Sequence, residues 1–180
     1  MLAKGFSATT VEDICRASKL TKGSFFHYFE SKEALGKAVL ERFCGGVKQH
    51  LGEAVCSAAG DPLERIDAQI DCAIKLSKDP DAVRGCLLGT FAQELSDTHP
   101  DIRSSCAKQF GEWTAALQQD LRDAKAKYAP KAIFDARTLA EHFIAVLEGA
   151  LILAKAKQDG KVVETSLEHY RRYVHGLLER

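Results

Sequence analysis

Apolar residues recur every three or four positions along most of this 180-residue sequence. A stripe of this kind is formed by Val163, Leu167, Tyr170, Val174 and Leu177, and another runs from Ile102 to Leu121. This spacing places the apolar side chains on one face of an α-helix. Since no segment alternates convincingly between apolar and polar residues, as a half-buried strand does, the sequence predicts an all-α fold.

Helix-start signals divide the chain into expected helices. Asp61-Pro62-Leu63-Glu64 combines a capping Asp with Pro at the first helical position, and His99-Pro100 and Asp79-Pro80 are weaker examples. Thr9 and Glu12 fit a capping box. The glycine pair Gly45-Gly46 is expected to bend or weaken its helix. The expected helices cover residues 10–17, 21–28, 32–57, 62–78, 86–96, 100–127, 135–158 and 161–178.

Composition excludes several classes of protein. No apolar segment approaches the roughly 18 residues that a membrane span needs, and no signal peptide opens the chain. The six cysteines form no CxxC pair, so we expect no zinc site and no other metal, and the thiols are expected to be reduced in the cytoplasm. With 25 basic and 25 acidic residues, net charge does not discriminate between partners.

Residues 9–29 have the pattern of a helix-turn-helix. Val11, Ile14 and Cys15 share one face of the first short helix, and Phe25 and Phe29 share one face of the second. A tight connection through Ser18-Lys19-Leu20 leads to Thr21, a helix cap. The second helix turns polar and aromatic side chains outward, which is what a DNA major groove admits.

The same region resembles the tetracycline-repressor (TetR) family of regulators. Three runs carry the resemblance: Gly5-Phe6-x-x-Thr9-Thr10-Val11-x-Asp13-Ile14, Thr21-Lys22-Gly23-Ser24-Phe25-Phe26-His27-Tyr28-Phe29 and Ser31-Lys32-Glu33-Ala34-Leu35. The resemblance implies a DNA-binding domain at residues 1–45, an effector-binding and dimerisation domain at 46–180, and a recognition helix at 21–28. It further implies a repressor that a small-molecule effector releases from a palindromic operator in double-stranded DNA, without a cofactor.

The resemblance also assigns roles to residues of the helix-turn-helix. Thr10, Tyr28 and Lys32 are expected to contact phosphates. Thr21, which caps the recognition helix, is also expected among the DNA-binding residues, and His27 is either a groove reader or a solvated tip. Phe26 stands where the family usually has Tyr, so it offers a thymine methyl contact in place of a hydrogen bond. The residues expected over base edges are Lys22, Gly23, Ser24 and Phe26.

In the family a helix of about twenty residues precedes the Gly-Phe of the motif, where this sequence has four residues. The expectation is a truncated three-helix domain, or else loosely held residues 1–30. Without that helix Ile14, Phe25 and Phe29 lose a covering surface, and each large side chain left exposed lowers the stability of the domain by about 1.5–3 kcal/mol. We therefore expect this polypeptide to bind DNA less tightly than an N-terminally extended version.

The helix at 135–158 is apolar on two sides, so one stripe can serve the subunit core and the other a partner. Together with the helix at 161–178 it predicts a four-helix interface across a two-fold axis, as in the family; the alternative is a core confined to one chain. The residues expected at this homodimer interface are Leu139, Phe143, Val146, Leu147, Ala150, Leu151, Leu167, Tyr170 and Val174.

An effector pocket is expected among the helices at 62–127, with Leu87, Phe91, Phe110, Trp113 and Phe143 as wall residues or as plain core. Cys86 is expected at a helix start, where backbone N–H groups and Arg84 favour its thiolate. The run Gly85-Cys86-Leu87-Leu88-Gly89, with Glu94, resembles a branch of the family that senses electrophiles or oxidants. The alternative is that Cys86 is a buried filler.

An enzyme is not expected, because the six histidines pair with no nucleophile or carboxylate and no P-loop or Gly-x-Ser-x-Gly is present. A helical adaptor without DNA binding explains the bundle but not the recognition helix.

Overall fold

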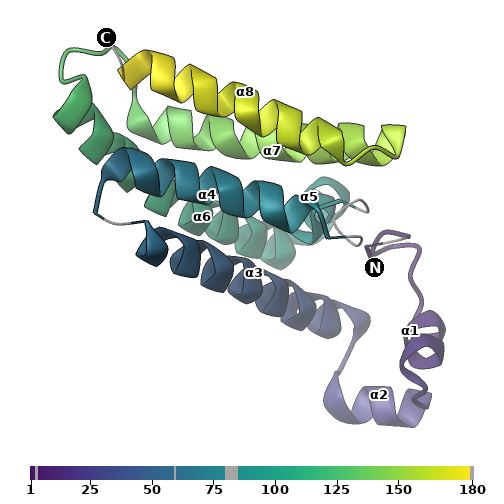
Figure 1. Cartoon of the computed structure of the whole chain (residues 1–180). Coiled ribbons are helices and arrows are strands. Elements are labelled where there is room, and N and C mark those ends of the chain that lie inside the picture. Colours follow the sequence, from purple (N-terminus) through teal and green to yellow (C-terminus); the bar gives the residue numbers. More distant parts are fainter. Residues whose placement is uncertain (3, 59, 80–84, 179–180) are drawn as a thin grey trace.

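The computed structural model describes residues 1–2, 4–58, 60–79 and 85–178, and within them it contains eight α-helices and no strand (Figure 1). The all-α prediction is confirmed, and every helix end lies within one residue of the expected position. The helices are α1 (Val11–Ser18), α2 (Lys22–Tyr28), α3 (Lys32–Ser57), α4 (Pro62–Ser77), α5 (Leu87–Leu95), α6 (Pro100–Tyr128), α7 (Ala136–Lys157) and α8 (Lys161–Leu178).

The caps explain why the helices start where they do. Asp61 accepts a hydrogen bond from the Leu63 amide at 2.8 Å, with Pro62 as the first residue of α4. The expected cap of α1 was wrong by one residue: Thr10 and Asp13 form the capping box. Thr9 is instead buried, and its hydroxyl donates to the Gly5 carbonyl at 2.6 Å. The weaker signal at Asp79-Pro80 extends outside the described residues.

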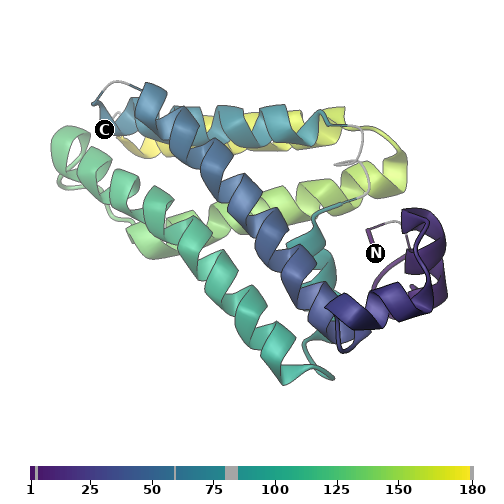
Figure 2. The same ribbon diagram turned by 90° about the horizontal axis from the view of Figure 1, so that it is seen from below.

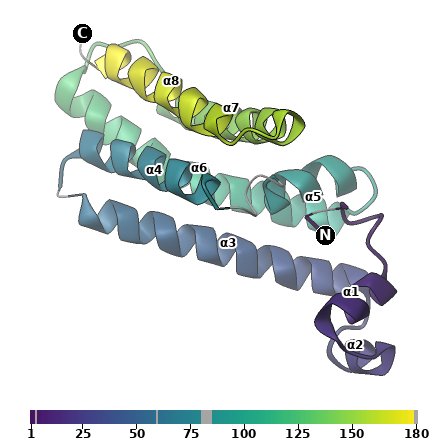
Figure 3. The same cartoon turned by 45° about the vertical axis from the view of Figure 1, so that its right-hand side comes forward.

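Helix α3 connects the helix-turn-helix to the rest of the chain. It continues without a break through Gly45 and Gly46, where the sequence predicted a bend or a weakening, and it crosses the predicted domain boundary after residue 45. Figures 2 and 3 show α3 along one side of the larger helical body, with α1 and α2 at one end. Because a continuous helix is stiff, a tilt of α3 moves α1 and α2 with it.

Two apolar clusters hold the body together. The larger one joins α4, α6, α7 and α8, and Ile66, Leu121 and Leu167 are completely buried in it. The smaller one lies nearer α1 and α2, where Phe6, Leu40 and Phe91 meet residues of α6. The smaller cluster packs α5 and α6 against α3, and the larger cluster packs α6 against α7.

No helix in the described part of the chain is both long enough and apolar enough to cross a membrane. In the same part, no group of three or more His, Cys, Asp or Glu side chains is placed to hold a metal ion.

Candidate nucleic-acid interface and ligand cavities

A tight turn joins α1 and α2, which we call the head. Lys19 ends α1 in the left-handed conformation with φ of 57°, and the Leu20 amide donates to the Cys15 carbonyl at 2.9 Å. Thr21 then caps α2 by accepting a hydrogen bond from the Ser24 amide at 3.1 Å. Cys15 and Phe25 are buried as expected, whereas Val11, Ile14 and Phe29 are half-buried.

The outer face of α2 is free for a partner. Phe26 is 55% exposed and Tyr28 73% exposed, and His27 packs edge-on against the Tyr28 ring. Thr10, Thr21, Lys22 and Gly23 are also exposed, and Ser24 is half-buried. A short helix that presents small, cationic and aromatic side chains has the shape and chemistry to enter a major groove.

Two lysines of this region already have partners. Lys22 forms an ion pair with Glu12 of α1, which raises the pKa of Lys22 and lowers that of Glu12. Since both side chains are exposed, this pair contributes little to stability and a DNA phosphate or base can replace it. The Lys32 ammonium donates to the Phe6 and Thr9 carbonyls, each at 3.0 Å, and lies 4.4 Å from the centre of the Phe6 ring.

The role of Glu94, which lies across the loop before α1 from Lys32, was not predicted from the sequence. Glu94 of α5 accepts hydrogen bonds from the Phe6 and Ser7 amides, both at 2.7 Å. Partial burial raises the pKa of Glu94, but these two amides outweigh it, so the pKa lies below its ordinary value. The only signal in the sequence was that Glu94 accompanies the Gly85–Gly89 run.

An apolar cavity of about 360 Å³ lies between α3, α4, α6 and α7. Trp113 and Phe143 are in its wall, as expected. Leu87, Phe91 and Phe110 are not: the first two are buried in the smaller apolar cluster, and Phe110 packs edge-on against Trp113. The other residues that line the cavity are Leu2, Phe43, Val47, Leu51, Gln69, Ala73, Leu76, Ser77, Asp79, Gly85, Cys86, Ile144, Leu147 and Leu151.

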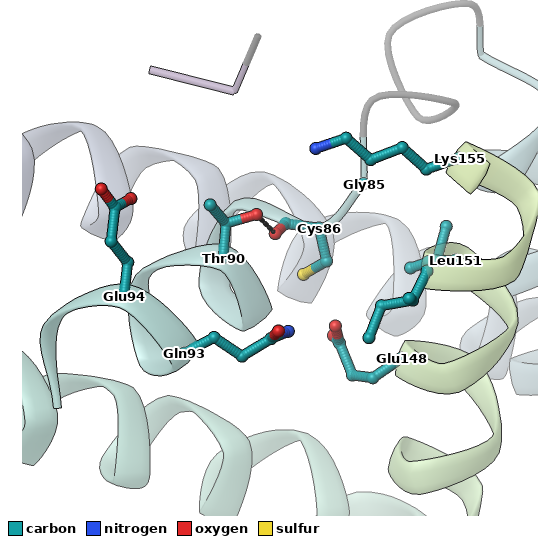
Figure 4. A pocket seen from close by; sticks show the side chains of 9 residues that line it. Gly85, Cys86, Thr90, Gln93, Glu94, Glu148, Leu151 and Lys155 are labelled. Atoms are coloured by element: carbon teal, nitrogen blue, oxygen red, sulfur yellow. Dashed lines mark hydrogen bonds between the residues drawn. The ribbon is translucent and has the colours of Figure 1, made fainter. Parts of the chain in front are cut away.

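A second cavity, of about 350 Å³, opens at the start of α5 and is more polar (Figure 4). Gln93 and Thr90 of α5 line it, as do Glu148 and Lys155 of α7. Cys86 lies directly before α5 and belongs to the walls of both cavities. Its position therefore gives one thiol access to an apolar space and to a polar one.

The surroundings of Cys86 oppose the thiolate that the sequence predicted. Burial raises its pKa well above the ordinary value, and the Glu148 carboxylate, which accepts a hydrogen bond from the thiol, raises it further. The amides of Gly89 and Leu88 act in the opposite direction but do not prevail. Arg84, the expected cationic neighbour, lies outside the described residues. In the resting protein Cys86 is a protonated thiol.

Glu148 is itself unusual. Burial raises its pKa, and among the described residues its buried Oε1 atom has no hydrogen-bond partner. Gly89 makes room for the carboxylate, because a Cβ atom at that position would collide with it. Glu148 of α7 thus lies directly against the first turn of α5.

The residues expected at the dimer interface differ in how far a single chain already buries them. Most of the expected residues serve the core of a single chain: Leu139, Phe143, Ala150, Leu151, Leu167, Tyr170 and Val174 are all buried in it. Leu147 and Val146 are half-buried: Leu147 lines the apolar cavity, and Val146 packs in part against the larger apolar cluster. Helices α6 and α8 pack against α7, and the residues of its two apolar stripes are all buried or half-buried.

A different surface on α7 and α8 is open. We call it the uncharged strip, because it contains no Lys, Arg, Asp or Glu. Leu153 is 48% exposed and Tyr173 53% exposed, and the rings of Tyr173 and His142 meet edge-on at 6.2 Å. The strip consists of His142, Ala145, Val146, Gly149, Leu153 and Ala156 on α7 with Ser166, His169, Tyr173 and Leu177 on α8.

Comparison with known proteins identifies the family. The model of bacterial regulatory proteins of the tetR family matches residues 1–39, and the model of the tetracyclin repressor-like C-terminal domain matches residues 62–170. The chain belongs to the TetR family. It is accordingly a DNA-binding transcriptional regulator, and the members of its family are regulators rather than enzymes.

Named TetR-family relatives span most of the chain. It is 28% identical to the repressor NemR of Escherichia coli K12 over 96% of this chain and 87% of NemR. It is 32% identical to the regulator AcuR of Cereibacter sphaeroides over 84% and 69%, and 27% identical to the repressor DhaR of Mycobacterium sp. GP1 over 92% and 82%.

Solved structures of the family have the same fold. The crystal structure of a TetR regulatory protein from Rhodobacter sphaeroides superimposes with a TM-score of 0.83 at 28% identity, covering 95% of this chain and 91% of that one. The reduced form of E. coli NemR gives 0.79 at 29% identity, covering 95% and 89%.

Proposed function

We propose that this protein is a repressor that binds a palindromic operator as a homodimer and leaves it when a small molecule occupies the body. The exposed outer face of α2 carries the proposal, since it is the surface with the shape and chemistry for a major groove. The repressors DhaR and NemR among the relatives support it. A protein with this role works where the chromosome is, and we place it in the cytoplasm.

On DNA, Tyr28 and Thr10 contact phosphates, and Lys22, Gly23, Ser24, Phe26 and His27 face the bases. Thr21 holds the first turn of α2 in place. Lys32 acts through the fold, because two carbonyls already occupy its ammonium.

Selection of DNA from a random pool by the wild-type chain tests the proposal. We expect an enriched sequence with two inverted half-sites whose centres lie about 34 Å apart. If no sequence is enriched, the helical adaptor explains the protein better.

Replacing Phe26 by Ala is expected to weaken binding to the selected operator by about tenfold, because a contact to a thymine methyl is lost. Binding to unrelated DNA should not change, since that depends on phosphate contacts. Leu20→Ala is the control: Leu20 is 51% exposed in the turn before α2. Equal losses on both kinds of DNA for Phe26→Ala would remove this residue from base recognition.

The apolar cavity is the proposed effector site, since Trp113, Phe143 and the other apolar side chains of its wall leave about 360 Å³ for a ligand. The uncharged strip is the proposed dimer surface. Two copies of α7 and α8 packed across a two-fold axis would form a four-helix interface.

A second candidate is a repressor that responds to electrophiles through Cys86, because this thiol reaches both cavities. The thiol would add across an activated carbon–carbon double bond, forming an S–C bond while its proton passes to the neighbouring carbon. Its raised pKa implies selectivity: only an electrophile that first binds in a cavity reacts quickly.

We expect the exposed Cys56 to react with iodoacetamide much faster than Cys86 near neutral pH. The rate at Cys86 should keep rising as the pH increases above 9, because only the thiolate attacks. N-Phenylmaleimide is apolar and can bind in the cavity beside Cys86, so the reaction rates of the two thiols should differ less with this reagent. Peptide mass spectrometry measures both rates in one sample. A Cys86 that is the fastest thiol with iodoacetamide at pH 7 contradicts the structure.

A further inference from the structure

The loop Gly5–Thr9, which we call the anchor loop, attaches the head to the body beside α3. Its Phe6 ring is 2% exposed and meets the Phe91 ring of α5 edge-on at 5.5 Å. Gly36 of α3 admits this ring, because a Cβ atom there would lie 2.8 Å from it. Phe6 is thus wedged between α5, which belongs to the body, and α3, which carries the head.

Two opposite charges hold the backbone of the anchor loop. Glu94 accepts the amide protons of Phe6 and Ser7, and Lys32 donates to the carbonyls of Phe6 and Thr9. Glu94 lies on α5 and Lys32 on α3. The loop therefore stays in place only while α5 and α3 keep their mutual position.

Helix α5 runs from the sensing cavities to this loop. It has nine residues, with Cys86 directly before its first turn and Glu94 in its last. Glu94 also contributes to the wall of the polar cavity, along with Thr90 and Gln93 of the same helix. A helix this short moves as one piece, so an occupant that displaces its start displaces Glu94 as well.

We propose that Glu94 is the positioning residue through which the cavities at the start of α5 control the head: its carboxylate fixes the anchor loop, and a shift of α5 releases that loop. This rests on the proposed function. Hydrogen bonds of 2.7 Å to an ionised acceptor are strong but short-ranged, so a shift of about 1 Å is enough to break both. Lys32 then keeps the loop on α3, and the head follows α3 instead of α5.

Glu94→Gln tests the proposal with little change of shape, because a carboxamide offers one acceptor oxygen where the carboxylate offers two. Asp97→Asn is the matched control, since it removes the same charge from an exposed residue two positions beyond the end of α5. Hydrogen–deuterium exchange of the Phe6 and Ser7 amides should become about tenfold faster in Glu94→Gln and stay unchanged in Asp97→Asn.

The same two variants are then titrated with the DNA that the wild-type chain selects. Glu94→Gln should bind it about tenfold more weakly than wild type, with the same sequence preference, because the reading surface of α2 is intact but less well placed. Unchanged exchange at Phe6 and Ser7, or faster exchange with full DNA affinity, overturns the proposal. Failure of the wild type to select any DNA refutes the proposed function instead.

Gly5→Ala disturbs the same contact from the side of the anchor loop and changes no residue of α5. Gly5 has φ of +84°, and a Cβ atom there would lie 2.9 Å from the Glu94 carboxylate. It should reproduce the faster exchange and weaker DNA binding even where Glu94→Gln folds poorly. Wild-type behaviour in Gly5→Ala counts against the proposal.

The link to the cavity is tested with N-phenylmaleimide. Modification of Cys86 should accelerate exchange of the Phe6 and Ser7 amides in the wild type, with Cys86→Ser as the control for the other thiols. In Glu94→Gln the reagent should add nothing further. An equal additional rise in both proteins shows that the signal bypasses Glu94 and overturns the proposal.

Discussion

Replacing Leu153 by Arg is expected to turn the protein into a monomer and to weaken its binding to a palindromic operator by about a hundredfold or more. Leu153 is 48% exposed on the uncharged strip of α7, where the described residues of one chain leave it without cover. In a dimer the guanidinium introduced at this position would lie near its copy across the two-fold axis. It would lose its hydration there without a carboxylate on the strip to pair with, which opposes association. Two monomers that bind the half-sites separately lack the gain in affinity that a dimer obtains by binding both at once.

Sedimentation or light scattering gives the mass, and titration of the selected DNA gives the affinity. Ile133→Arg is the control, since Ile133 is fully exposed in the connection between α6 and α7 and lies outside the strip. A Leu153→Arg protein that remains a dimer would show that the partner binds elsewhere. A monomer with undiminished affinity would show that pairing does not contribute to binding.

The sequence predicts the helices well because the signals that start and end them are local. Asp61-Pro62 determines the start of α4 by itself, and the 3.6-residue spacing identifies the buried face of α8 without knowledge of its neighbours. The exposed face of α2 could be predicted for the same reason, with Phe25 turned inward and Phe26 outward.

Features that depend on packing between distant segments could not be predicted. Glu94 and Phe6 are 88 residues apart, and no local pattern indicates their hydrogen bond. The thiolate expected at Cys86 followed from its place before α5, but burial between packed helices, together with the Glu148 carboxylate from α7, raises the pKa of the thiol. The dimer surface is a similar case: a second apolar stripe on α7 implied a partner, but much of that stripe packs within one chain, which the sequence alone does not reveal.

Replacing Phe91 by Ala is expected to lower the free energy of unfolding by about 3–5 kcal/mol, the range for a fully buried Phe. Phe91 is 0% exposed, lies in the smaller apolar cluster and supports the Phe6 ring of the anchor loop. The cavity left by the ring therefore weakens the body and the attachment of the head together. Urea unfolding at one fixed protein concentration measures the loss.

Phe110→Ala is the matched control for this change. Phe110 lies at the edge of the same cluster and is half-buried, so removing its ring leaves a gap that water can enter. We expect a loss for Phe110→Ala of less than half that for Phe91→Ala. Because Phe91 also supports Phe6, exchange of the Phe6 and Ser7 amides should accelerate in Phe91→Ala and not in Phe110→Ala, below the urea concentration that unfolds either variant. Equal acceleration in both would mean that the anchor loop responds to the stability of the whole cluster and not to its contact with α5.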